Sequence, residues 1–497
     1  MNATLPQAWA AHFESAPDRP LLWEERRGWV RAGELDHASR RVAARLAGAG
    51  LRPGDRILMS AGTSVELVEA HVAALRLGLV VVPANTAYRE REIAHLVRDA
   101  APRSAVVDDP ERAGWIRNSD PGVLVVGPDV ALAEGSGAAP VLDVAAPSDP
   151  ALIGYTSGTT GAPKGAVLSH GNLLASSESV RLAWRWTADD RLVLALPLFH
   201  IHGLGVGLHG TLLAGASAVL LPRFDPDAVL DATAAHDATL FFGVPTMYAR
   251  LAASPRLGEL GRLRLCVSGS APLPPAVFER LAEGSGQRVL ERYGMTETGM
   301  NVSNPYDGER RPGTVGFPLP GVELRLAPGG TGGVPPTTAA EAARVSGEIQ
   351  LRGPNVFGGY WGKPEATAEA FTDDGWFRTG DIGEHDADGY LRLVGRARDL
   401  IITGGLNVYP REVEDVLLEH PAVAEVAVSG SPDPEWGEIV TAWVVPAAAA
   451  DPPEEAELTG FAAERLARFK CPRRVVLVDT LPRNALGKVL RHELRPD

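Results

Sequence analysis

Cysteine is scarce in this sequence, whose 497 residues include only Cys266 and Cys471. The two lack the CxxC spacing of thiolate zinc sites and cannot build a disulfide framework, so a reducing, cytoplasmic location is expected. Basic residues are also in deficit: 48 Lys and Arg stand against 62 Asp and Glu, a formal net charge of −14. Such a chain repels phosphate backbones as a whole, so no nucleic-acid partner is expected. A local basic pocket for a nucleotide stays open.

Targeting signals and membrane-spanning segments are not expected either. The first 20 residues carry no basic stretch and no apolar run before Glu14. Residues 192–222 contain no Asp, Glu, Lys or Arg, and their length alone would permit a membrane span. The run also contains three histidines, two prolines and many glycines. We interpret it as the buried interior of an α/β domain, without membrane contact.

Most of the chain alternates β-rich runs with amphipathic helical windows. Arg56–Ser60 and Leu79–Pro83 are typical of strands and Ser64–Leu77 of the helix between them, which indicates parallel sheets. After about residue 312, short strands with Gly, Pro and Asp turns indicate a small β-subdomain. Residues 396–497 read as a compact α+β unit. We therefore predict an α/β fold with a large N-terminal domain of several subdomains, 1–395, and a small α+β C-terminal domain, 396–497.

The strongest local pattern is the run YTSGTTGAPKG at residues 155–165, directly after an apolar strand predicted at Ala151–Tyr155. Its glycines, Gly158 and Gly161 among them, let backbone N–H groups converge on phosphate oxygens. The hydroxyls of Thr156, Ser157, Thr159 and Thr160 and the ammonium of Lys164 would add to such a site. Gly165 follows the lysine, so the run is not a Walker A loop. The alternative, a flexible Gly/Ser/Thr linker, would not need the strand before it.

Four further motifs follow in order: RYGMTET at 292–298, FRTGD at 377–381, GRARD at 395–399 and PRNALGK at 482–488. Together with the loop they resemble the adenylate-forming superfamily of acyl-CoA synthetases, peptide-synthetase adenylation domains and firefly luciferases. The resemblance implies that a carboxylate and ATP form an acyl-adenylate and pyrophosphate, and that coenzyme A then attacks the adenylate. Such a reaction depends on positive charge and positioning rather than on a protein nucleophile. The implied substrates and cofactors are ATP, Mg²⁺, coenzyme A and a small carboxylic acid.

The resemblance also assigns roles to single residues. Lys488 would bridge the carboxylate and the α-phosphate, with Thr296 and Glu297 as further catalytic residues and Glu297 as the magnesium ligand. The implied ATP-binding residues are the loop residues 156–161 with Lys164, and Ser270, Ala271, Tyr293, Asp381 and Arg396. Arg398 would be the hinge of a mobile C-terminal domain, which rotates after adenylation and brings Gly404 and Gly405 toward coenzyme A. Without the motifs, Lys488 would read as a solvated lysine and Asp381 as a turn cap.

The pair His200 and His202 allows three interpretations. On a strand, residues i and i+2 face one side, so the pair could bind a metal, although no third ligand stands at a convincing spacing. The histidines could also be core residues. The resemblance favours the third interpretation, in which this segment forms the wall of the acyl pocket.

The acid itself is indicated by residues 291–301, which read ERYGMTETGMN. This run is similar to that of malonyl-CoA synthetases, and the similarity extends over essentially the whole chain. It implies an acyl pocket of His200, Ile201, Arg292, Gly294, Met295 and Met300. An arginine suits the second carboxylate of malonate or methylmalonate through a bidentate pair. The alternatives are an arginine paired with Glu291 or Glu297, or one exposed to solvent.

Other functions remain open at this point. The chain could activate a short- or medium-chain monocarboxylic acid, load a carrier protein, or bind such ligands without catalysis, although Lys488, Glu297, Asp381 and Arg396 are all present. Lys488 is also a candidate target of a lysine acetyltransferase, because acetylation would remove its charge. The sequence does not indicate an oligomeric state.

Overall fold

The computed structural model describes residues 3–132, 139–156, 163–327, 346–396, 399–403, 406–434, 436–447, 452–484 and 487–494. Contacts divide the chain into two compact units, the first made of 1–323 and 352–377 and the second of 324–351 and 378–497. The second unit therefore groups the small β-subdomain with the C-terminal residues. The domain boundary predicted between residues 395 and 396 is not one of these division points and stays a prediction.

The first unit contains a six-stranded sheet in the order β6-β5-β3-β4-β7-β8. Its strands are β3 (Arg56–Ser60), β4 (Val80–Pro83), β5 (Ser104–Val107), β6 (Leu124–Val126), β7 (Pro150–Thr156) and β8 (Lys164–Ser169). The pairs from β6 to β7 are parallel, and β8 returns antiparallel to β7. The central strands are apolar on both faces, as expected for a parallel sheet covered by helices, which confirms the predicted α/β class.

A second sheet of the same unit runs in the order β15-β14-β13-β12-β11-β9-β10-β1-β2. Its strands are β1 (Pro20–Glu24), β2 (Gly28–Arg31), β9 (Arg191–Leu194), β10 (Ser217–Leu220), β11 (Leu240–Gly243), β12 (Leu265–Ser268), β13 (Leu290–Met295), β14 (Gly299–Ser303) and β15 (Phe317–Pro318). The strands from β13 to β1 are parallel. Their carboxyl ends share one edge, where ligands of such sheets bind.

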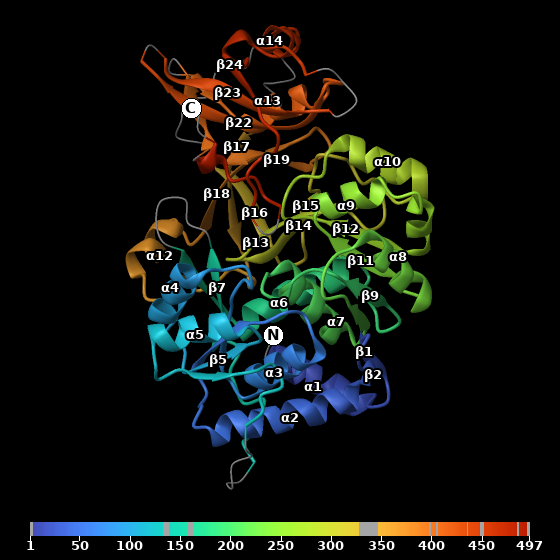
Figure 1. The fold of residues 1–497 in the computed structure, drawn as a ribbon, viewed down its shortest axis with the longest axis vertical. Helices are drawn as coiled ribbons and strands as arrows, with labels where there is room; N and C mark the ends of the chain where they lie inside the picture. The colour runs from blue at the N-terminus through green and yellow to red at the C-terminus, as the bar shows by residue number, and fades with distance from the viewer. Residues whose placement is uncertain are drawn as a thin grey trace. The chain divides into compact units, whose positions relative to one another are not determined.

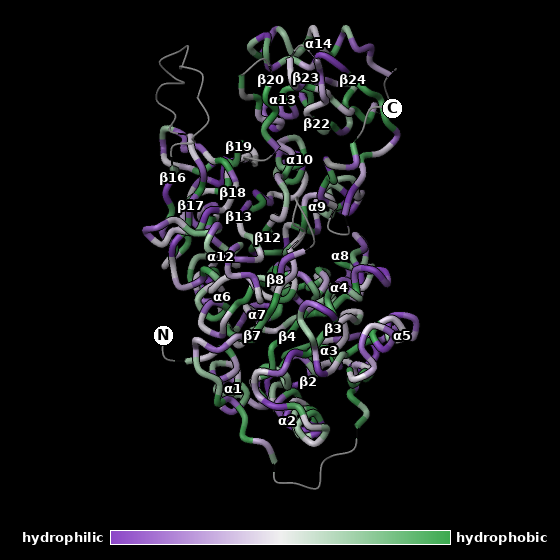
Figure 2. The backbone as a smooth tube through the Cα atoms, turned by 90° about the vertical axis from the view of Figure 1, so that its left-hand side faces the viewer, coloured by the Kyte–Doolittle hydropathy of each residue, from purple (hydrophilic) through white to green (hydrophobic). Residues whose placement is uncertain are grey.

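Helices cover these sheets, with α8, α9 and α10 beside β11 and β12 in Figure 1. Their bounds are α1 (Leu5–Ser15), α2 (Ala32–Gly48), α3 (Val65–Arg76), α4 (Glu90–Ala100), α5 (Pro110–Ser119), α6 (His170–Ala183), α7 (His209–Ala214), α8 (Pro226–Ala235), α9 (Pro245–Ala252), α10 (Pro275–Ser285) and α12 (Pro364–Ala370), with a π-helix η1 (His202–Leu208) and a 3₁₀ helix η2 (Leu257–Arg262). Figure 2 shows hydrophobic β4 inside the unit and hydrophilic stretches on the outer helix α5. Apolar residues of the helices pack with those of the strands, as Ile93 and Leu96 of α4 do with Leu58.

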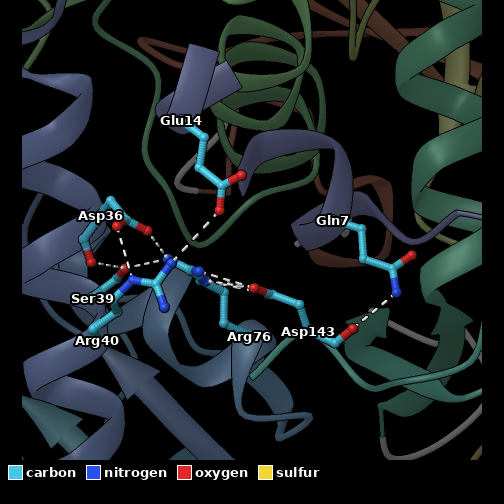
Figure 3. Close-up of polar contacts among 7 residues, drawn as sticks. All are labelled: Gln7, Glu14, Asp36, Ser39, Arg40, Arg76 and Asp143. Carbon is cyan, nitrogen blue, oxygen red and sulfur yellow. Dashed lines mark hydrogen bonds and ion pairs between the residues drawn. The ribbon is translucent and has the colours of Figure 1, made fainter. Parts of the chain in front are cut away.

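A buried arginine joins three of these helices (Figure 3). The Arg76 side chain, 1% exposed, donates to Asp36 Oδ1 at 2.5 Å and to Asp143 Oδ2 at 2.9 Å. Burial alone would raise the pKa of Asp36, but hydrogen bonds from Arg40 and Arg76 hold that pKa below its ordinary value. Gln7 Nε2 donates to the Asp143 carbonyl at 2.8 Å, so the network ties α1, α2 and α3 to the segment before β7.

The second unit contains two smaller sheets. Strands β16 (Glu323–Ala327), β17 (Ser346–Arg352), β18 (Phe377–His385) and β19 (Leu391–Arg396) form one, in chain order. Strands β20 (Ile401–Thr403), β21 (Leu406–Val408), β22 (Val423–Asp433), β23 (Gly437–Pro446) and β24 (Arg474–Leu477) form the other. Helices α13 (Pro410–Leu417) and α14 (Glu455–Ala463) and 3₁₀ helices η4 (Arg468–Lys470) and η5 (Arg491–Glu493) complete the unit. Val413, Leu417 and Leu458 of the helices share one core with the strands.

The uncharged run at residues 192–222 folds inside the first unit. It contains most of β9, the π-helix η1, α7 and β10, and its central residues are buried. His200 and His202 do not lie on a strand, so the metal interpretation loses the extended backbone that it required. Among the described residues, no helix is both long and apolar enough to cross a membrane.

Candidate active site

The hairpin of β7 and β8 carries the predicted phosphate loop. Thr156 and Lys164 form the last pair of the hairpin before the loop, and Thr156 Oγ1 donates to the Lys164 carbonyl at 3.4 Å. Ser157, Gly158, Thr159, Thr160 and Gly161 lie outside the described residues. The two described stems therefore bring Thr156 and Lys164 side by side, as a loop that closes on a phosphate requires.

A tyrosine links Lys164 to the predicted magnesium ligand. The ammonium nitrogen of Lys164 lies 5.4 Å from the centre of the Tyr360 ring. Tyr360 in turn donates its hydroxyl to Glu297 Oε1 at 3.1 Å. Burial, followed by the charge of Glu297, raises the pKa of Tyr360, so this hydroxyl stays a donor at neutral pH. Lys164 and Glu297, 133 positions apart as their numbers show, thus belong to one site.

Strand β7 also packs directly on Thr296. A Cβ atom built on Gly154 would lie 2.4 Å from Thr296 Cγ2, so only glycine permits this approach. Glu297 is 6% exposed, and its carbonyl accepts a 2.9 Å hydrogen bond from the Phe357 N–H. The structure therefore brings the predicted residues Thr296, Glu297 and Lys164 together around the end of the β7–β8 hairpin.

Arg292 on β13 is a buried cation. It is 4% exposed, and its Nε and Nη2 atoms have no hydrogen-bond partner. Among the described residues it forms no ion pair, because Glu291 turns away and accepts the N–H groups of Leu273 and Gly313 at 3.1 Å. Burial lowers the pKa of Arg292 to about 9, a shift that the nearby Tyr248 only partly opposes. Both alternatives for this arginine, a pair with Glu291 or Glu297 and exposure to solvent, are therefore wrong.

Two histidines and a glycine lie around this cation. A Cβ atom on Gly269 would lie 2.4 Å from the Arg292 guanidinium carbon, so the side chain rests on the backbone of the loop after β12. Burial and then the charge of Arg292 lower the pKa of His200 to about 4, and they lower that of His202 well below its ordinary value. Both imidazoles are therefore neutral at pH 7 and can face an anion only as hydrogen-bond donors.

The loop after β12 approaches His202 through a strained residue. Ser270 has φ +75°, which is uncommon for a residue other than glycine, and its hydroxyl lies 3.5 Å from His202 Nδ1. The backbone N–H of His202 donates to His200 Nδ1 at 3.2 Å. Ala271 follows in the same loop and is half-buried. Strain of this kind persists where the surroundings impose it, which is frequent at ligand sites.

The hairpin of β13 and β14 supplies the remaining predicted acyl residues. Gly294 pairs with Met300 and Met295 with Gly299, and a Cβ atom on Gly294 would lie 2.4 Å from Met300 Cε. Tyr293, on the same strand, is 7% exposed. Behind the hairpin lies a cavity of about 10 Å³, lined by Ile201, Gly205, Val206, Ser176, Gly299 and Asn355 among others. This volume admits about one water molecule.

The second unit contains three predicted site residues that are described, Asp381, Arg396 and Lys488, of which Lys488 is far from the other two in the sequence. Asp381 on β18 is 6% exposed and pairs in register with Arg396 of β19, and its backbone N–H donates to Thr379 Oγ1 at 3.1 Å. Lys488 is half-buried, and its N–H donates to Asn484 Oδ1 at 3.0 Å. Arg398, Gly404 and Gly405 lie outside the described residues.

Sequence reasoning missed Tyr360 and Ser176. Tyr360 lies in the run GGYWGK at 358–363, where an aromatic pair among glycines could have marked a close approach to the phosphate hairpin. Ser176, which accepts the Met300 N–H at 3.0 Å, is one of three small residues in a row on α6, 175–177, and carries no such mark. Among the described residues, no cluster of three or more His, Cys, Asp or Glu side chains could hold a metal, so nothing supports the metal interpretation of His200 and His202.

Comparisons with known proteins agree with this arrangement. A family model described as AMP-binding enzyme matches residues 9–361, and one described as AMP-binding enzyme C-terminal domain matches 412–488. A feruloyl-CoA synthase of Amycolatopsis is 39% identical over 93% of this chain and 92% of its own length. The crystal structure of ATP-bound MatB from Rhodopseudomonas palustris is 42% identical, covers 99% of this chain and 98% of its own, and has a TM-score of 0.89.

A malonyl-CoA ligase solved as a ternary product complex with methylmalonyl-CoA and AMP is 44% identical over 94% of this chain and 97% of its own, with a TM-score of 0.66. Relatives that act on chemically different acids thus share the fold and most of the length of this chain. The chain belongs to the family of AMP-binding enzymes, and it is an AMP-forming acyl-CoA ligase of the adenylate-forming superfamily.

Proposed function

We propose that the enzyme activates malonate or methylmalonate, first as the acyl-adenylate and then as the coenzyme A thioester. Arg292 carries this proposal, because it is a buried guanidinium with two unpartnered nitrogen atoms and no ion pair to any carboxylate of the described residues. A buried charge without a partner is costly, and a second carboxylate on the substrate would relieve that cost through a bidentate pair. The neutral His200 and His202 would add donors without competing for the anion.

The other roles follow from the chemistry of each group. Lys164 and the loop it closes would hold the ATP phosphates, and Asp381 would accept hydrogen bonds from the ribose hydroxyls. Lys488 would bridge the carboxylate and the α-phosphate. Glu297 supplies the hard oxygen that Mg²⁺ prefers, and the buried hydroxyl of Tyr360 keeps this carboxylate in place. Bound there, Mg²⁺ would neutralise charge on the phosphates.

The test is pyrophosphate release with each of several acids, measured with and without coenzyme A. Malonate and methylmalonate should be turned over, and acetate, butyrate and octanoate should be poor substrates, because a site built for a polar group can reject analogues that lack it by about 10⁴-fold. Sulfoacetate is an informative addition, since it presents a sulfonate where malonate has its second carboxylate. Preference for butyrate or octanoate over malonate would overturn the assignment.

A second candidate substrate is an aromatic monocarboxylic acid. The similarity to a feruloyl-CoA synthase over 93% of this chain favours it, and ferulate therefore belongs in the same assay. An aromatic ring would offer no anion to the unpartnered guanidinium of Arg292, and this favours the small dicarboxylic acids.

A further inference from the structure

Both ends of the phosphate hairpin touch one face of helix α4. His95 and Asp99 are four residues apart on this helix and therefore lie one above the other. On one stem, Tyr155 donates its hydroxyl to Asp99 Oδ2 at 2.7 Å. On the other, His95 Nε2 lies 2.9 Å from the carbonyl oxygen of Pro163, which can only accept, so Nε2 carries the proton. A single helix thus holds the residue just before the loop and the residue just after it.

Asp99 connects this helix to a third segment. Lys363 Nζ donates to Asp99 Oδ1 at 3.2 Å, and Trp361 Nε1 donates to the Asp99 carbonyl at 3.2 Å. Burial, followed by the bond to Asp99, raises the pKa of Tyr155, so its hydroxyl remains a donor at every pH the protein tolerates. The Asp99 carboxylate therefore accepts hydrogen bonds from the neutral hydroxyl of Tyr155 and from the ammonium group of Lys363. The first donor belongs to the hairpin and the second to the segment 358–363.

The same segment, 358–363, completes the connection to the candidate magnesium ligand. It runs beside β8, where the backbone N–H of Trp361 donates to the Gly165 carbonyl at 2.8 Å. Tyr360 forms an isolated antiparallel β-bridge with Ala166 of the same strand. Tyr360 then reaches Glu297 at 3.1 Å. A path of contacts therefore runs from α4 through Lys363 and Tyr360 to Glu297, with both stems of the hairpin attached to it.

We propose that His95 and Asp99 are positioning residues for ATP, which fix the two stems of the phosphate loop and couple them to the Tyr360–Glu297 pair. This inference rests on the proposed role of the loop in binding phosphate. Neither side chain needs to touch ATP. Holding both stems in place before ATP arrives would preorganise the residues on either side of the loop, and such preorganisation appears in the affinity for the nucleotide.

The experiment compares the KM for ATP with the KM for the acid in the full-length enzyme, and measures the affinity for a fluorescent ATP analogue without acid. Asp99→Asn and His95→Leu should each raise the KM for ATP and the dissociation constant of the analogue about tenfold, the effect of losing one charge-assisted or buried hydrogen bond. The KM for malonate should stay within about twofold. His95→Gln should restore the affinity for ATP, because the amide N–H can still donate to Pro163.

A matched control separates positioning from stability. Asp36 and Asp99 are similarly exposed, 15% and 17%, and each pairs with a cation. Asp36 lies in the Arg76 network, and among the described residues it makes no hydrogen bond or ion pair with the hairpin. Asp36→Asn should lower the thermal unfolding midpoint and leave the KM for ATP unchanged. Tyr155→Phe should reproduce part of the Asp99→Asn effect, and it provides a second measurement if His95→Leu fails to fold.

Equal KM values for ATP in the wild type and in Asp99→Asn and Tyr155→Phe would overturn the proposal, and so would a His95→Gln variant as defective as His95→Leu. Failure of the underlying function looks different. In that case the wild-type enzyme itself would neither bind the ATP analogue nor release pyrophosphate with any acid, and variants would not need to be compared.

Discussion

Arg292 and Arg76 are buried to a similar degree, 4% and 1% exposed, in opposite surroundings. Arg76 has two carboxylate partners and Arg292 has none among the described residues. Arg292→Leu should therefore lower kcat/KM for malonate by about 10²–10³-fold, since loss of one partner of a buried pair costs about 3–5 kcal/mol. The same change should raise the thermal unfolding midpoint of the ligand-free enzyme, because it removes an uncompensated charge. Pyrophosphate release and calorimetry measure the two effects.

Arg76→Leu is the control for this pair of effects. It should lower the unfolding midpoint, because Asp36 and Asp143 would be left without their cation. If Arg292→Leu instead turns over malonate within a few-fold of the wild type, the arginine is structural, and the dicarboxylate assignment loses its support.

The charge of Arg292 also predicts a pH dependence. Because burial lowers the pKa of this residue to about 9, the cation is fully present at pH 7 and is lost as the pH rises through 9. The kcat/KM for malonate reports on the free enzyme, so it should be level below about pH 8 and fall above pH 9. Bound malonate favours the charged form, and kcat should therefore fall only at higher pH. A kcat/KM profile that stays level to pH 10 in a stable enzyme would contradict this.

At the scale of elements, the β13–β14 hairpin meets helix α6 at a single tight contact. Gly299 has φ +62°, and a Cβ atom there would lie 2.2 Å from Ser176 Oγ. Gly299→Ala should destabilise the enzyme through both backbone strain and this clash, by about 1–3 kcal/mol in total. Ser176→Gly should relieve the clash and leave the strain, so the double variant should be more stable than additivity predicts. Additive changes in the free energy of unfolding would show that the hairpin moves away instead.

Elements with a clear period were predictable from sequence. The strand and helix at Arg56–Ser60 and Ser64–Leu77 appear as β3 and α3, and the strand expected at Leu79–Pro83 appears as β4. The π-helix within residues 200–208 was not predictable. Its glycines leave no apolar pattern that distinguishes a π-helix from an α-helix, and its hydrogen bonds depend on the surrounding core. Tyr360 joins Glu297 only through tertiary structure, and no spacing in the sequence encodes that contact.

At the scale of the whole molecule, the predicted chemical groups fall into separate compact units. Arg292, Lys164 and Glu297 belong to the first unit, and Asp381 and Lys488 to the second. The resemblance to adenylate-forming enzymes implies that the C-terminal domain moves between the two half-reactions. A lysine that acts only before this movement should matter for one half-reaction alone.

Lys488→Ala should therefore abolish formation of the malonyl-adenylate while sparing thioester formation from a supplied adenylate. The lysine charge would stabilise the meeting of two anions in the first step, and the thiol attack of the second step does not bring the carboxylate and ATP together. Pyrophosphate release measures the first half-reaction, and release of AMP from synthetic malonyl-adenylate with coenzyme A measures the second. Lys488→Arg is the matched control, because it keeps the positive charge but replaces the compact ammonium with a planar guanidinium. It should therefore retain part of the first half-reaction. Equal loss of both half-reactions in Lys488→Ala would mean that the lysine serves the fold of the second unit or both chemical steps.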